Sequence, residues 1–542
     1  MTLEVQDLVP AALRRRWASE GICPDLDLYA LFRAHRFADP GRPAVIDAAG
    51  TLTYAELDLL ARAAAMGLRR LGVCEGDVVG VQLPNGRDAV IAELAVAALG
   101  AVALPFPVGR GMAEAVSLLG RTGARVAVVA TEHRGHRHAA ELLAGAERLP
   151  ALRAVVAAGP RDCPPGGTPW SRIIGTDATG FVPARPDPDG PARILVSSGS
   201  EAAPKMIAYS HNALAGGRGN FLGSLLGDGG GPPRCLLLVP LGSAFGSNGT
   251  PVTLARHGGC LVLPGRFSPV TALTALAEHR PTHVLAVPAM IRMMLDRPDT
   301  GPVPPMTALL VGGSELDART ADEARARFGC PVVNVYGSAD GVNCHSGLAP
   351  VRAADDSGSG VVVGRPDPRV AEIRVAPVPG ERRGGEILAR GPMTPMCYVG
   401  APELNQRYRT AEGWVRTGDL GMIDDSGLLH LVGRLKQIVI RGGLNISPAE
   451  VERALASHPR VRDTVCFGVP DPVLGERLAV CVVPRPGQVV DLDDLCAHLA
   501  QQGLEKAKHP ERLLLVDELP LTPAGKPDRD ALRERLPAEA PA

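Results

Sequence analysis

The sequence predicts an α/β fold followed by a small α+β domain, and three features of the 542-residue chain support this prediction. Over roughly the first two thirds, short apolar runs rich in β-branched residues alternate with alanine-rich segments of helical periodicity. Such alternation is typical of largely parallel, buried strands. After about residue 362, short strands punctuated by glycine predict a small antiparallel unit. After about residue 434, helices and strands alternate again in a compact C-terminal block.

The elements of the N-terminal part follow from these periodicities in order. Residues 51–72 predict a short strand and then an amphipathic helix, because apolar residues recur at three- and four-residue spacing. Buried strands are expected at DVVGVQL, ARVAVVA, CLLLVPL, ALLVGG and PVVNVYG, which are residues 77–83, 124–130, 235–241, 308–313 and 331–337. The Pro- and Gly-rich residues 158–192 predict a surface crossing, and residues 227–233 and 353–360 predict loops.

The second part predicts the strands EIRVAP, GGEILARG, GLLHLVGR and QIVIRGG. At Ser447-Pro448-Ala449-Glu450 we expect a helix to begin, with serine as the cap, proline at the first position and glutamate reaching back. Strands at 463–469 and 477–484, a helix at 492–503 and a strand at 511–519 complete the block. We place the domain junction near Arg434, which gives domains of residues 1–434 and 435–542.

Composition excludes several functional classes. The formal net charge of −1 gives no reason to expect nucleic acid or an anionic membrane as a partner. No apolar run approaches the roughly 20 residues of a transmembrane helix, and the acidic N-terminus has no apolar core of an export signal, so a cytoplasmic location is expected. The eleven cysteines are scattered without a CxxC pair, which argues against a disulfide framework and a zinc site.

Lysine usage singles out candidate residues. The chain has 57 lysines and arginines, but its lysines are only Lys205, Lys436, Lys506, Lys508 and Lys526. A compact ammonium and a planar guanidinium do different work, so a lysine kept in an arginine-rich background is a functional candidate. For Lys506 and Lys508 we prefer chance retention, whereas we keep Lys205 and Lys526 as functional candidates.

Those motifs each have a functional and a plain structural interpretation. The small residues of VSSGSEAAPK follow a strand and could surround an anion with N–H groups while Lys205 adds a cation, although such a loop is most often only a loop. VYGSAD places Asp340 at the end of a buried strand, where ligands bind in open α/β sheets and a carboxylate could hold Mg²⁺. Asp419 in RTGD could accept from ribose hydroxyls or simply form an Asx turn. Lys526 in PLTPAGK would by itself be a solvent-exposed turn lysine.

The order of these motifs changes that balance. The phosphate loop, VGGSE, VYGSAD, RTGD, GRLKQ…RGG and PLTPAGK together resemble the adenylate-forming superfamily from Leu28 to Leu536. That superfamily holds the acyl- and aryl-CoA synthetases, the adenylation domains of nonribosomal peptide synthetases and the luciferases. Within it, VQLPN, VYGSADGVN and the C-terminal segment are most similar to stand-alone aryl-acid AMP ligases of the 2,3-dihydroxybenzoate type. The resemblance implies layered α/β subdomains plus a small β-barrel, and a mobile C-terminal domain.

The resemblance also implies the site residues. Lys526 would bridge the attacking carboxylate and the α-phosphate, and Lys205 and Arg434 would be the other catalytic cations. After adenylation, the C-terminal domain would rotate and present a face built on Gly442-Gly443. The implied ATP contacts are Ser197, Ser198, Gly199, Ser200 and Glu201 for the phosphates; Gly312, Gly313 and Tyr336 around adenine; Ser314, Gly337, Ser338 and Ala339 as further nucleotide-binding residues; Asp340 for Mg²⁺; and Asp419 with Arg434 for ribose. The implied acid pocket contains Ala244, Phe245, Ser247, Asn334, Val342 and Asn343.

The sequence departs from the superfamily's pattern at the nucleotide motifs. Ser200-Glu201-Ala202 replaces the usual Thr-Thr-Gly of the phosphate loop, and Met206 replaces a common glycine. Ala339 and Asp340 stand where threonine and glutamate are usual, and Gln437 replaces the hinge aspartate. A glutamate beside a polyphosphate repels it unless the side chain is turned away or bridged by Mg²⁺. Because the lysines and the ribose-binding pair survive, we expect a working enzyme with an altered site.

The acid pocket departs as well. Gly242-Ser243 replaces the customary aromatic or histidine residue. Ala244 stands where α-amino-acid domains keep an aspartate for the ammonium and where dihydroxybenzoate ligases keep an asparagine for the ortho hydroxyl. An alanine side chain can hold neither group. We therefore expect a less ortho-substituted benzoic or cinnamic acid rather than an α-amino acid or 2,3-dihydroxybenzoate.

The predicted activity is ATP- and Mg²⁺-dependent formation of an acyl-adenylate with pyrophosphate release. The acyl group would then pass to a carrier-protein thiol, to coenzyme A or to an amine, in natural-product biosynthesis. Because the chain ends soon after Lys526, a carrier is expected to be a separate protein. One alternative is an ATP-dependent diazotase that uses nitrite and an aryl amine, which nitrite-dependent AMP formation would reveal. The other is a non-catalytic binding protein, which full cellular function of a Lys526→Ala variant would favour.

Overall fold

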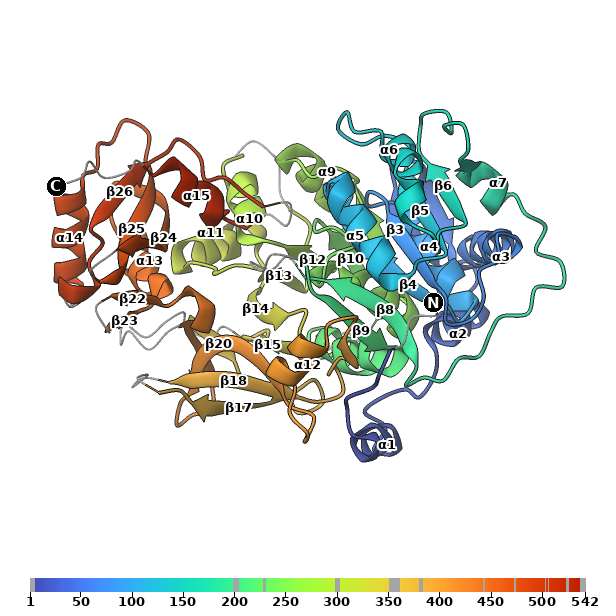
Figure 1. The fold of residues 1–542 in the computed structure, drawn as a ribbon, viewed down its shortest axis with the longest axis horizontal. Helices are drawn as coiled ribbons and strands as arrows, with labels where there is room; N and C mark the ends of the chain where they lie inside the picture. Colours follow the sequence, from blue (N-terminus) through green and yellow to red (C-terminus); the bar gives the residue numbers. More distant parts are fainter. Residues whose placement is uncertain are drawn as a thin grey trace.

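The computed structural model describes residues 5–197, 204–227, 231–297, 303–349, 361–379, 384–441, 444–471, 474–502, 504, 506–522 and 526–536. Within these residues the strands form four sheets, of eight, eight, five and five strands. The two large sheets belong to the N-terminal part, and one of the two five-stranded sheets forms the C-terminal unit (Figure 1). The structure confirms the predicted mixed α/β class.

The first large sheet carries the phosphate-loop motif. Its central strands, such as Val78–Gln82 and Val126–Ala130, are buried along their whole length, which is why they are continuous apolar runs. β3, β4, β5 and β6 pair in parallel, whereas β8 and β9 form an antiparallel hairpin. The strand order is β19 (Cys397–Tyr398), β9 (Met206–Ser210), β8 (Pro191–Val196), β4 (Val102–Pro105), β3 (Val78–Gln82), β5 (Val126–Ala130), β6 (Ala154–Ala158) and β7 (Thr168–Pro169).

The second large sheet carries the motifs VGGSE and VYGSAD, which are expected to contact adenine and Mg²⁺. β1, β11, β10, β12, β13 and β14 pair in parallel, and antiparallel strands lie at both edges. The strand order is β15 (Val342–His345), β14 (Val332–Ser338), β13 (Ala308–Gly312), β12 (His283–Ala286), β10 (Arg234–Leu237), β11 (Cys260–Leu263), β1 (Pro43–Asp47) and β2 (Gly50–Thr53).

Sheets and helices alternate in layers. Neighbouring residues of one strand point to opposite faces, so Val79 belongs to the core shared by both sheets and Val78 to an outer core. The shared core takes side chains from α2 (Leu28–Ala38), α3 (Tyr54–Arg70), α4 (Arg87–Ala98), α8 (Gly219–Gly223) and the π-helical segments η2 (Ala213–Arg218) and η4 (Gly249–Arg256). The outer cores take side chains from α5 (Met112–Thr122), α6 (His138–Ala144), α9 (Pro269–His279), α10 (Pro288–Leu295) and α11 (Ala318–Phe328). The remaining helices of this part are α1 (Ala11–Ser19), η1 (Ala146–Arg148), α7 (Trp170–Ile174) and η3 (Phe245–Asn248).

The third sheet is the small antiparallel unit expected after residue 362. Its order is β16 (Val361–Gly364), β21 (Leu429–Arg434), β20 (Val415–Ile423), β18 (Gly385–Arg390) and β17 (Glu372–Pro377), with α12 (Pro402–Tyr408) beside it. The expected β-barrel corresponds to this sheet, whose edge strands β16 and β17 do not pair with each other in the described part of the chain. It lies below the large sheets in Figure 1.

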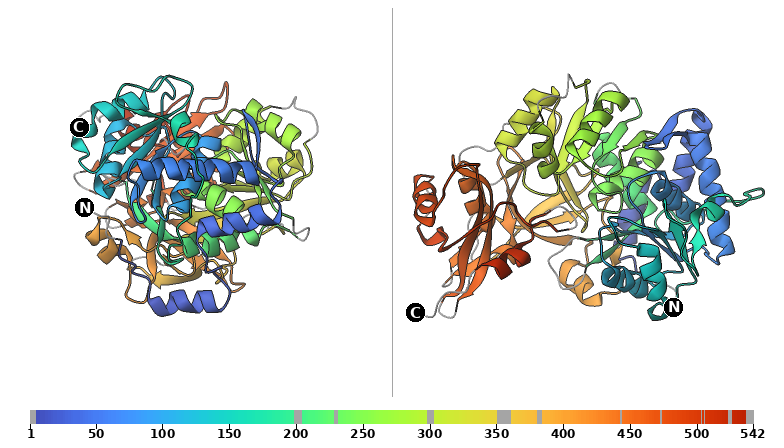
Figure 2. Two further views of the ribbon diagram at one scale, coloured as in Figure 1. Left: turned by 90° about the vertical axis from the view of Figure 1, so that its right-hand side faces the viewer. Right: turned by 90° about the horizontal axis from the view of Figure 1, so that it is seen from above.

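The fourth sheet forms the C-terminal unit, seen at the left of Figure 1 and in both views of Figure 2. QIVIRGG belongs here rather than to the preceding antiparallel unit, because β22 pairs with β23 and β25. The elements are η5 (Leu435–Gln437), β22 (Val439–Arg441), β23 (Leu444–Ile446), α13 (Pro448–Ala456), β24 (Val461–Asp471), β25 (Gly475–Pro484), α14 (Leu492–Gln501), η6 (Lys506–Lys508), β26 (Arg512–Leu515) and α15 (Arg529–Arg535).

The predicted reciprocal cap of α13 is wrong. The helix begins at Pro448 as expected, but Ser447 makes no capping hydrogen bond. Its hydroxyl donates to the Val432 carbonyl at 3.2 Å, and the Glu450 carboxylate accepts from Lys508 Nζ at 2.9 Å. The Ser447 hydroxyl and the Glu450 carboxylate therefore bind tertiary partners instead of capping the helix, and Lys508 has a structural partner.

Each of the eleven cysteines lies within the described residues and is a free thiol. Among the same residues, no three His, Cys, Asp or Glu side chains gather closely enough to hold a metal ion by themselves. No described helix is both long and apolar enough to cross a bilayer.

Candidate active site

The phosphate loop begins and ends at a hairpin whose two strands are tied together. Ser197 follows β8, and Lys205 precedes β9. The Ser197 N–H donates to the Lys205 carbonyl at 2.9 Å, and the Lys205 N–H donates to the Ser197 hydroxyl at 3.1 Å. Arg110 donates to the Ser197 carbonyl at 2.9 Å. The base of the loop is thus held by hydrogen bonds, whereas Ser198, Gly199, Ser200 and Glu201 lie outside the described residues.

Lys205 points from this hairpin to the edge of the second sheet. Its Nζ lies 3.4 Å from an Asp340 carboxylate oxygen, and both side chains are 14% exposed. The same ammonium lies 4.2 Å from the ring centre of Tyr408 and 5.3 Å from that of Tyr398. Both distances are within the range of a cation–π interaction. Two rings and one carboxylate therefore fix the position of the lysine charge.

Asp340 keeps acceptor capacity despite its partners. It occupies the turn between β14 and β15, where Ser338 donates to one carboxylate oxygen at 2.7 Å and Tyr398 donates to the other at 2.8 Å. An ionised carboxylate has about four acceptor positions, so the group can still take a further ligand. Mg²⁺ in nucleotide sites is often held by one or two carboxylates together with phosphate oxygens. The single carboxylate at this position fits such an ion.

A second cluster joins the two motifs expected to bind ribose and adenine. Asp419 on β20 lies directly opposite Arg434, the last residue of β21, in the antiparallel register. Its carboxylate is 2.7 Å from Arg434 Nε and accepts from the Tyr336 hydroxyl at 2.7 Å. Asp419 is 4% exposed, so these two donors stabilise a buried charge. Each carboxylate oxygen still has a lone pair for a sugar hydroxyl.

Lys526 enters this cluster from the C-terminal unit. Its turn is closed by Thr522, whose N–H donates to the Lys526 carbonyl at 2.7 Å. The pKa of Lys526 falls from its usual 10.5 to about 8, chiefly because the ammonium is buried and then because the Arg434 guanidinium is close; the Asp419 carboxylate opposes the decrease. Because both residues influence this pKa, Lys526 lies near the Asp419–Arg434 pair.

The glycines of VGGSE lie at the end of β13, next to the end of β14. A Cβ on Gly312 would lie 2.7 Å from the Val335 carbonyl, so only glycine allows β13 to approach β14 this closely. Gly313 has φ of +92°, a conformation that favours glycine, and it ends the strand with Ser314 exposed. Gly312, Gly313 and Ser314 are therefore at the same sheet edge as Gly337 and Ser338.

Sequence comparison agrees with this geometry. Residues 32–399 match the AMP-binding enzyme family, and residues 450–526 match the AMP-binding enzyme C-terminal domain. The chain belongs to the AMP-binding enzyme family. The predicted membership of the adenylate-forming superfamily is thereby confirmed.

The relatives of this AMP-binding enzyme include aryl-acid ligases. A 2-hydroxy-7-methoxy-5-methyl-1-naphthoate–CoA ligase of Streptomyces carzinostaticus is 33% identical over 519 residues, covering 91% of this chain and 90% of the relative. The salicyl-AMP ligase / salicyl-S-ArCP synthetase of Mycobacterium tuberculosis is 32% identical over 520 residues, covering 92% and 88%. Among solved structures, the amide bond synthetase McbA from Marinactinospora thermotolerans has a TM-score of 0.79 at 28% identity, covering 94% of this chain and 99% of that chain.

The predicted acid-pocket residues of the AMP-binding enzyme are only partly brought together. Ala244, Phe245 and Ser247 lie at η3, and the Ser247 hydroxyl donates to the Ala244 carbonyl at 2.6 Å, so it already has an acceptor within the chain. Opposite residues of an antiparallel pair share a face, so the Gly337–Asn343 and Ser338–Val342 pairs place Asn343 and Val342 on opposite faces of the sheet. The Asn334 amide donates to the Val362 carbonyl of β16 at 3.3 Å, away from η3.

Four tyrosines contact the site residues. Of these, only Tyr336 was expected from the sequence, and its partner was not. The chain has only six tyrosines. Tyr398 and Tyr408 contact Lys205, Tyr336 contacts Asp419, and Tyr209 donates to the Ala339 carbonyl at 2.8 Å. The scarcity of tyrosine in the AMP-binding enzyme is the same kind of signal as the scarcity of lysine, and counting tyrosines would have indicated these positions.

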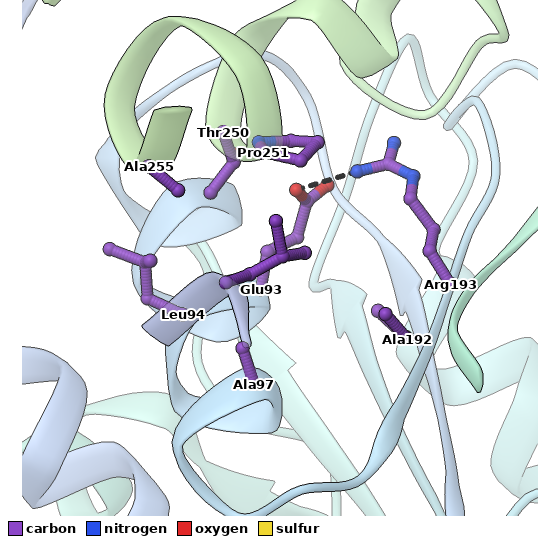
Figure 3. Close-up of a pocket in the computed structure, with 10 residues that line it drawn as sticks. Glu93, Leu94, Ala97, Ala192, Arg193, Thr250, Pro251 and Ala255 are labelled. Atoms are coloured by element: carbon purple, nitrogen blue, oxygen red, sulfur yellow. Dashed lines mark hydrogen bonds and ion pairs between the residues drawn. The ribbon is translucent and has the colours of Figure 1, made fainter. Parts of the chain in front are cut away.

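A small cavity lies between α4, β8 and η4. It has a volume of about 20 Å³ and is lined by residues of α4, β8 and η4, including Glu93, Arg193 and Thr250 (Figure 3). Arg193 Nη1 lies 2.7 Å from the Glu93 carboxylate, while Thr250 Oγ1 is buried without a partner in the described structure. The volume suits about one water molecule. The cavity therefore belongs to the buried core of the AMP-binding enzyme and not to an acid pocket.

Proposed function

We propose that this enzyme uses ATP and Mg²⁺ to convert an aromatic carboxylic acid to its acyl-adenylate, with release of pyrophosphate. The observation that carries the proposal is a cluster at the end of the third sheet, in which Arg434 pairs with the buried Asp419 at 2.7 Å and the C-terminal Lys526 lies nearby. A cation at this place can stabilise the charge that develops as a carboxylate attacks the α-phosphate. The names of the naphthoate and salicylate relatives support an aryl acid as the substrate.

The roles of the other residues follow from their partners. Lys205 and the Ser197–Glu201 loop would bind the phosphates, and Asp340 would hold Mg²⁺. When bound, the ion neutralises charge on phosphate oxygens. Asp419 would accept from the ribose hydroxyls while Arg434 keeps its carboxylate ionised and oriented. Gly312, Gly313 and Tyr336 would surround adenine, and Ser314, Gly337, Ser338 and Ala339 would be further nucleotide-binding residues.

Residues 1–434 and 435–542 would act as two domains. The last strand of the third sheet ends at Arg434, and the first strand of the C-terminal sheet begins at Val439. A short connection at this point supports a hinge, because a few residues at the end of an element can absorb a rotation. Rotation would remove Lys526 after adenylation and expose another face for the second half-reaction.

The acid and the acceptor are narrower proposals. Ala244 offers no side-chain group for an ortho hydroxyl or an ammonium, so we propose a benzoic or cinnamic acid without an ortho hydroxyl. In this respect the proposed substrate differs from the 2-hydroxy acid in the name of the naphthoate relative. The acyl group would pass to a carrier-protein thiol, to coenzyme A or to an amine, as the names of the three relatives above suggest. The reaction would take place in the cytoplasm, where ATP is supplied.

The test is pyrophosphate release by the full chain with Mg-ATP and a panel of benzoic and cinnamic acids, including amino-substituted ones, each with and without nitrite. Release with an acid alone is the expected result, and hydroxylamine trapping would identify the activated carboxyl group. Release only when nitrite and an aryl amine are both present would replace the proposal with diazotisation. The Lys526→Ala variant should lose the acid-dependent release.

A further inference from the structure

A buried arginine lies between the predicted acid pocket and the predicted nucleotide site. Arg218, the last residue of η2, is 2% exposed. One guanidinium nitrogen donates to the Ala244 carbonyl at 3.3 Å and another donates to the Tyr209 hydroxyl at 3.0 Å. The Tyr209 hydroxyl in turn donates to the Ala339 carbonyl at 2.8 Å. A continuous chain of hydrogen bonds therefore connects Ala244 with the residue that precedes Asp340.

The partners of Arg218 differ from those of the other fully buried arginines. Arg193 is paired with Glu93 at 2.7 Å and Arg14 with Asp7 at 3.1 Å. Within the described residues no carboxylate pairs with Arg218, and its Nε has no hydrogen-bond partner. A buried guanidinium without a counter-charge is costly, so an ordinary packing role does not explain its position. Its described polar contacts are the hydrogen bonds to the Ala244 carbonyl and to the Tyr209 hydroxyl, and the guanidinium carbon also lies 4.9 Å from the centre of the Tyr209 ring.

Close packing holds the two segments at the ends of this series of hydrogen bonds. A Cβ on Gly217, next to Arg218, would lie 2.1 Å from the Met393 nitrogen, so η2 rests directly on that backbone. A Cβ on Gly246, two residues after Ala244, would lie 1.9 Å from the Pro240 carbonyl oxygen. Because neither segment has space to shift by itself, a displacement of one is transmitted through the hydrogen bonds rather than absorbed by loose packing.

We propose that Arg218 and Tyr209 are positioning residues that couple acid binding to nucleotide binding. The proposal rests on the proposed function, because it assumes that Ala244 contacts the acid and that Asp340 serves the nucleotide. An acid that seats against Ala244 would fix its carbonyl, and Arg218 and Tyr209 would then hold Ala339 and Asp340 in the arrangement that binds Mg-ATP. Coupling of this kind is reciprocal, so the nucleotide should tighten acid binding by the same factor.

The test compares Tyr209→Phe with Tyr54→Phe in the full chain. Both tyrosines are fully buried, and both hydroxyls donate to a backbone carbonyl at 2.8 Å, Tyr209 to Ala339 and Tyr54 to Gly259. Tyr54 lies on α3, away from the site residues, so it controls for the loss of a buried hydroxyl. Binding of a non-hydrolysable ATP analogue with Mg²⁺ is titrated calorimetrically with and without the best acid of the panel. The ratio of the two dissociation constants measures the coupling.

We expect a ratio of about fivefold or more in the wild type and in Tyr54→Phe, and a ratio near one in Tyr209→Phe. The KM for the acid should rise about tenfold in Tyr209→Phe, the size of effect that follows when a buried carbonyl loses its donor. Arg218→Lys keeps the charge but not the two-armed geometry, so it should also lose the coupling. Equal ratios in Tyr209→Phe, Tyr54→Phe and the wild type would overturn the proposal.

The two proposals fail in different ways. If the wild type releases no pyrophosphate with any acid, the proposed function is wrong, and the hydrogen-bond chain is judged on nucleotide binding alone. In that case Tyr209→Phe must still weaken binding of the ATP analogue more than Tyr54→Phe does. If it does not, the coupling role is overturned as well.

Discussion

The rate of adenylation should fall above pH 8 because Lys526 loses its proton. Burial and the neighbouring Arg434 lower the pKa of this lysine from 10.5 to about 8. A group with that pKa is about 90% protonated at pH 7 and about 10% protonated at pH 9. If the protonated amine stabilises the transition state, the rate should be nearly constant up to pH 7, fall about tenfold between pH 7 and pH 9, and then fall about tenfold per pH unit.

The assay is pyrophosphate release under saturating Mg-ATP and acid from pH 6.5 to 9.5, with far-ultraviolet circular dichroism to show that the protein stays folded. Lys508→Arg is the matched control, because Lys508 is a lysine of the same unit that pairs with Glu450 at 2.9 Å, and its replacement should leave the pH profile unchanged. Lys526→Arg keeps a permanent charge, so its lower rate should not decline between pH 7 and pH 9. Arg434→Gln removes the second cause of the lowered pKa and should move the decline to higher pH.

A wild-type rate that stays constant to pH 9.5 would refute this reasoning. It would mean either that the pKa of Lys526 is not lowered in the working enzyme or that its charge does not limit adenylation. A decline that is equally present in Lys526→Arg would assign the titration to another group.

Three further perturbations test separate parts of the structure. Asp340→Asn should raise the Mg²⁺ concentration needed for half-maximal pyrophosphate release by about 10- to 100-fold, because the ion loses one charged partner. An unchanged Mg²⁺ concentration for half-maximal release would exclude Asp340 as the residue that holds Mg²⁺. Arg292 of α10 pairs with Asp463 of the C-terminal unit. Arg292→Gln should slow adenylation by up to about fivefold, which is the effect expected for a partly exposed ion pair. A change in stability without a change in rate would contradict a role of this pair in holding the two domains together. Arg193→Met leaves Glu93 buried without its partner and should lower the free energy of unfolding by about 3–5 kcal/mol in chemical denaturation, whereas Glu93→Gln with Arg193→Met should restore part of that loss.

Local patterns were sufficient for the elements and for the motifs. The strands Val78–Gln82 and Val126–Ala130 were predictable because a strand buried on both faces must be apolar throughout. The helix at Tyr54–Arg70 followed from its apolar spacing. Lys205 and Lys526 stood out because lysine is rare in this chain. Where a local signal and a tertiary partner competed, as at Ser447, the tertiary partner prevailed and the expected cap did not form.

By itself, the sequence determined the α/β class, the family and the positions of the ionic motifs, because periodicity and motif spacing are properties of neighbouring residues. Only the tertiary structure decided which of these groups meet. Lys205 and Asp340 are 135 residues apart in the chain, yet they share an ion pair enclosed by Tyr398 and Tyr408. The link through Arg218 likewise exists only because β9, η2 and the turn after β14 pack against one another. Such contacts depend on how sheets and helices are layered, and no short stretch of sequence specifies that arrangement.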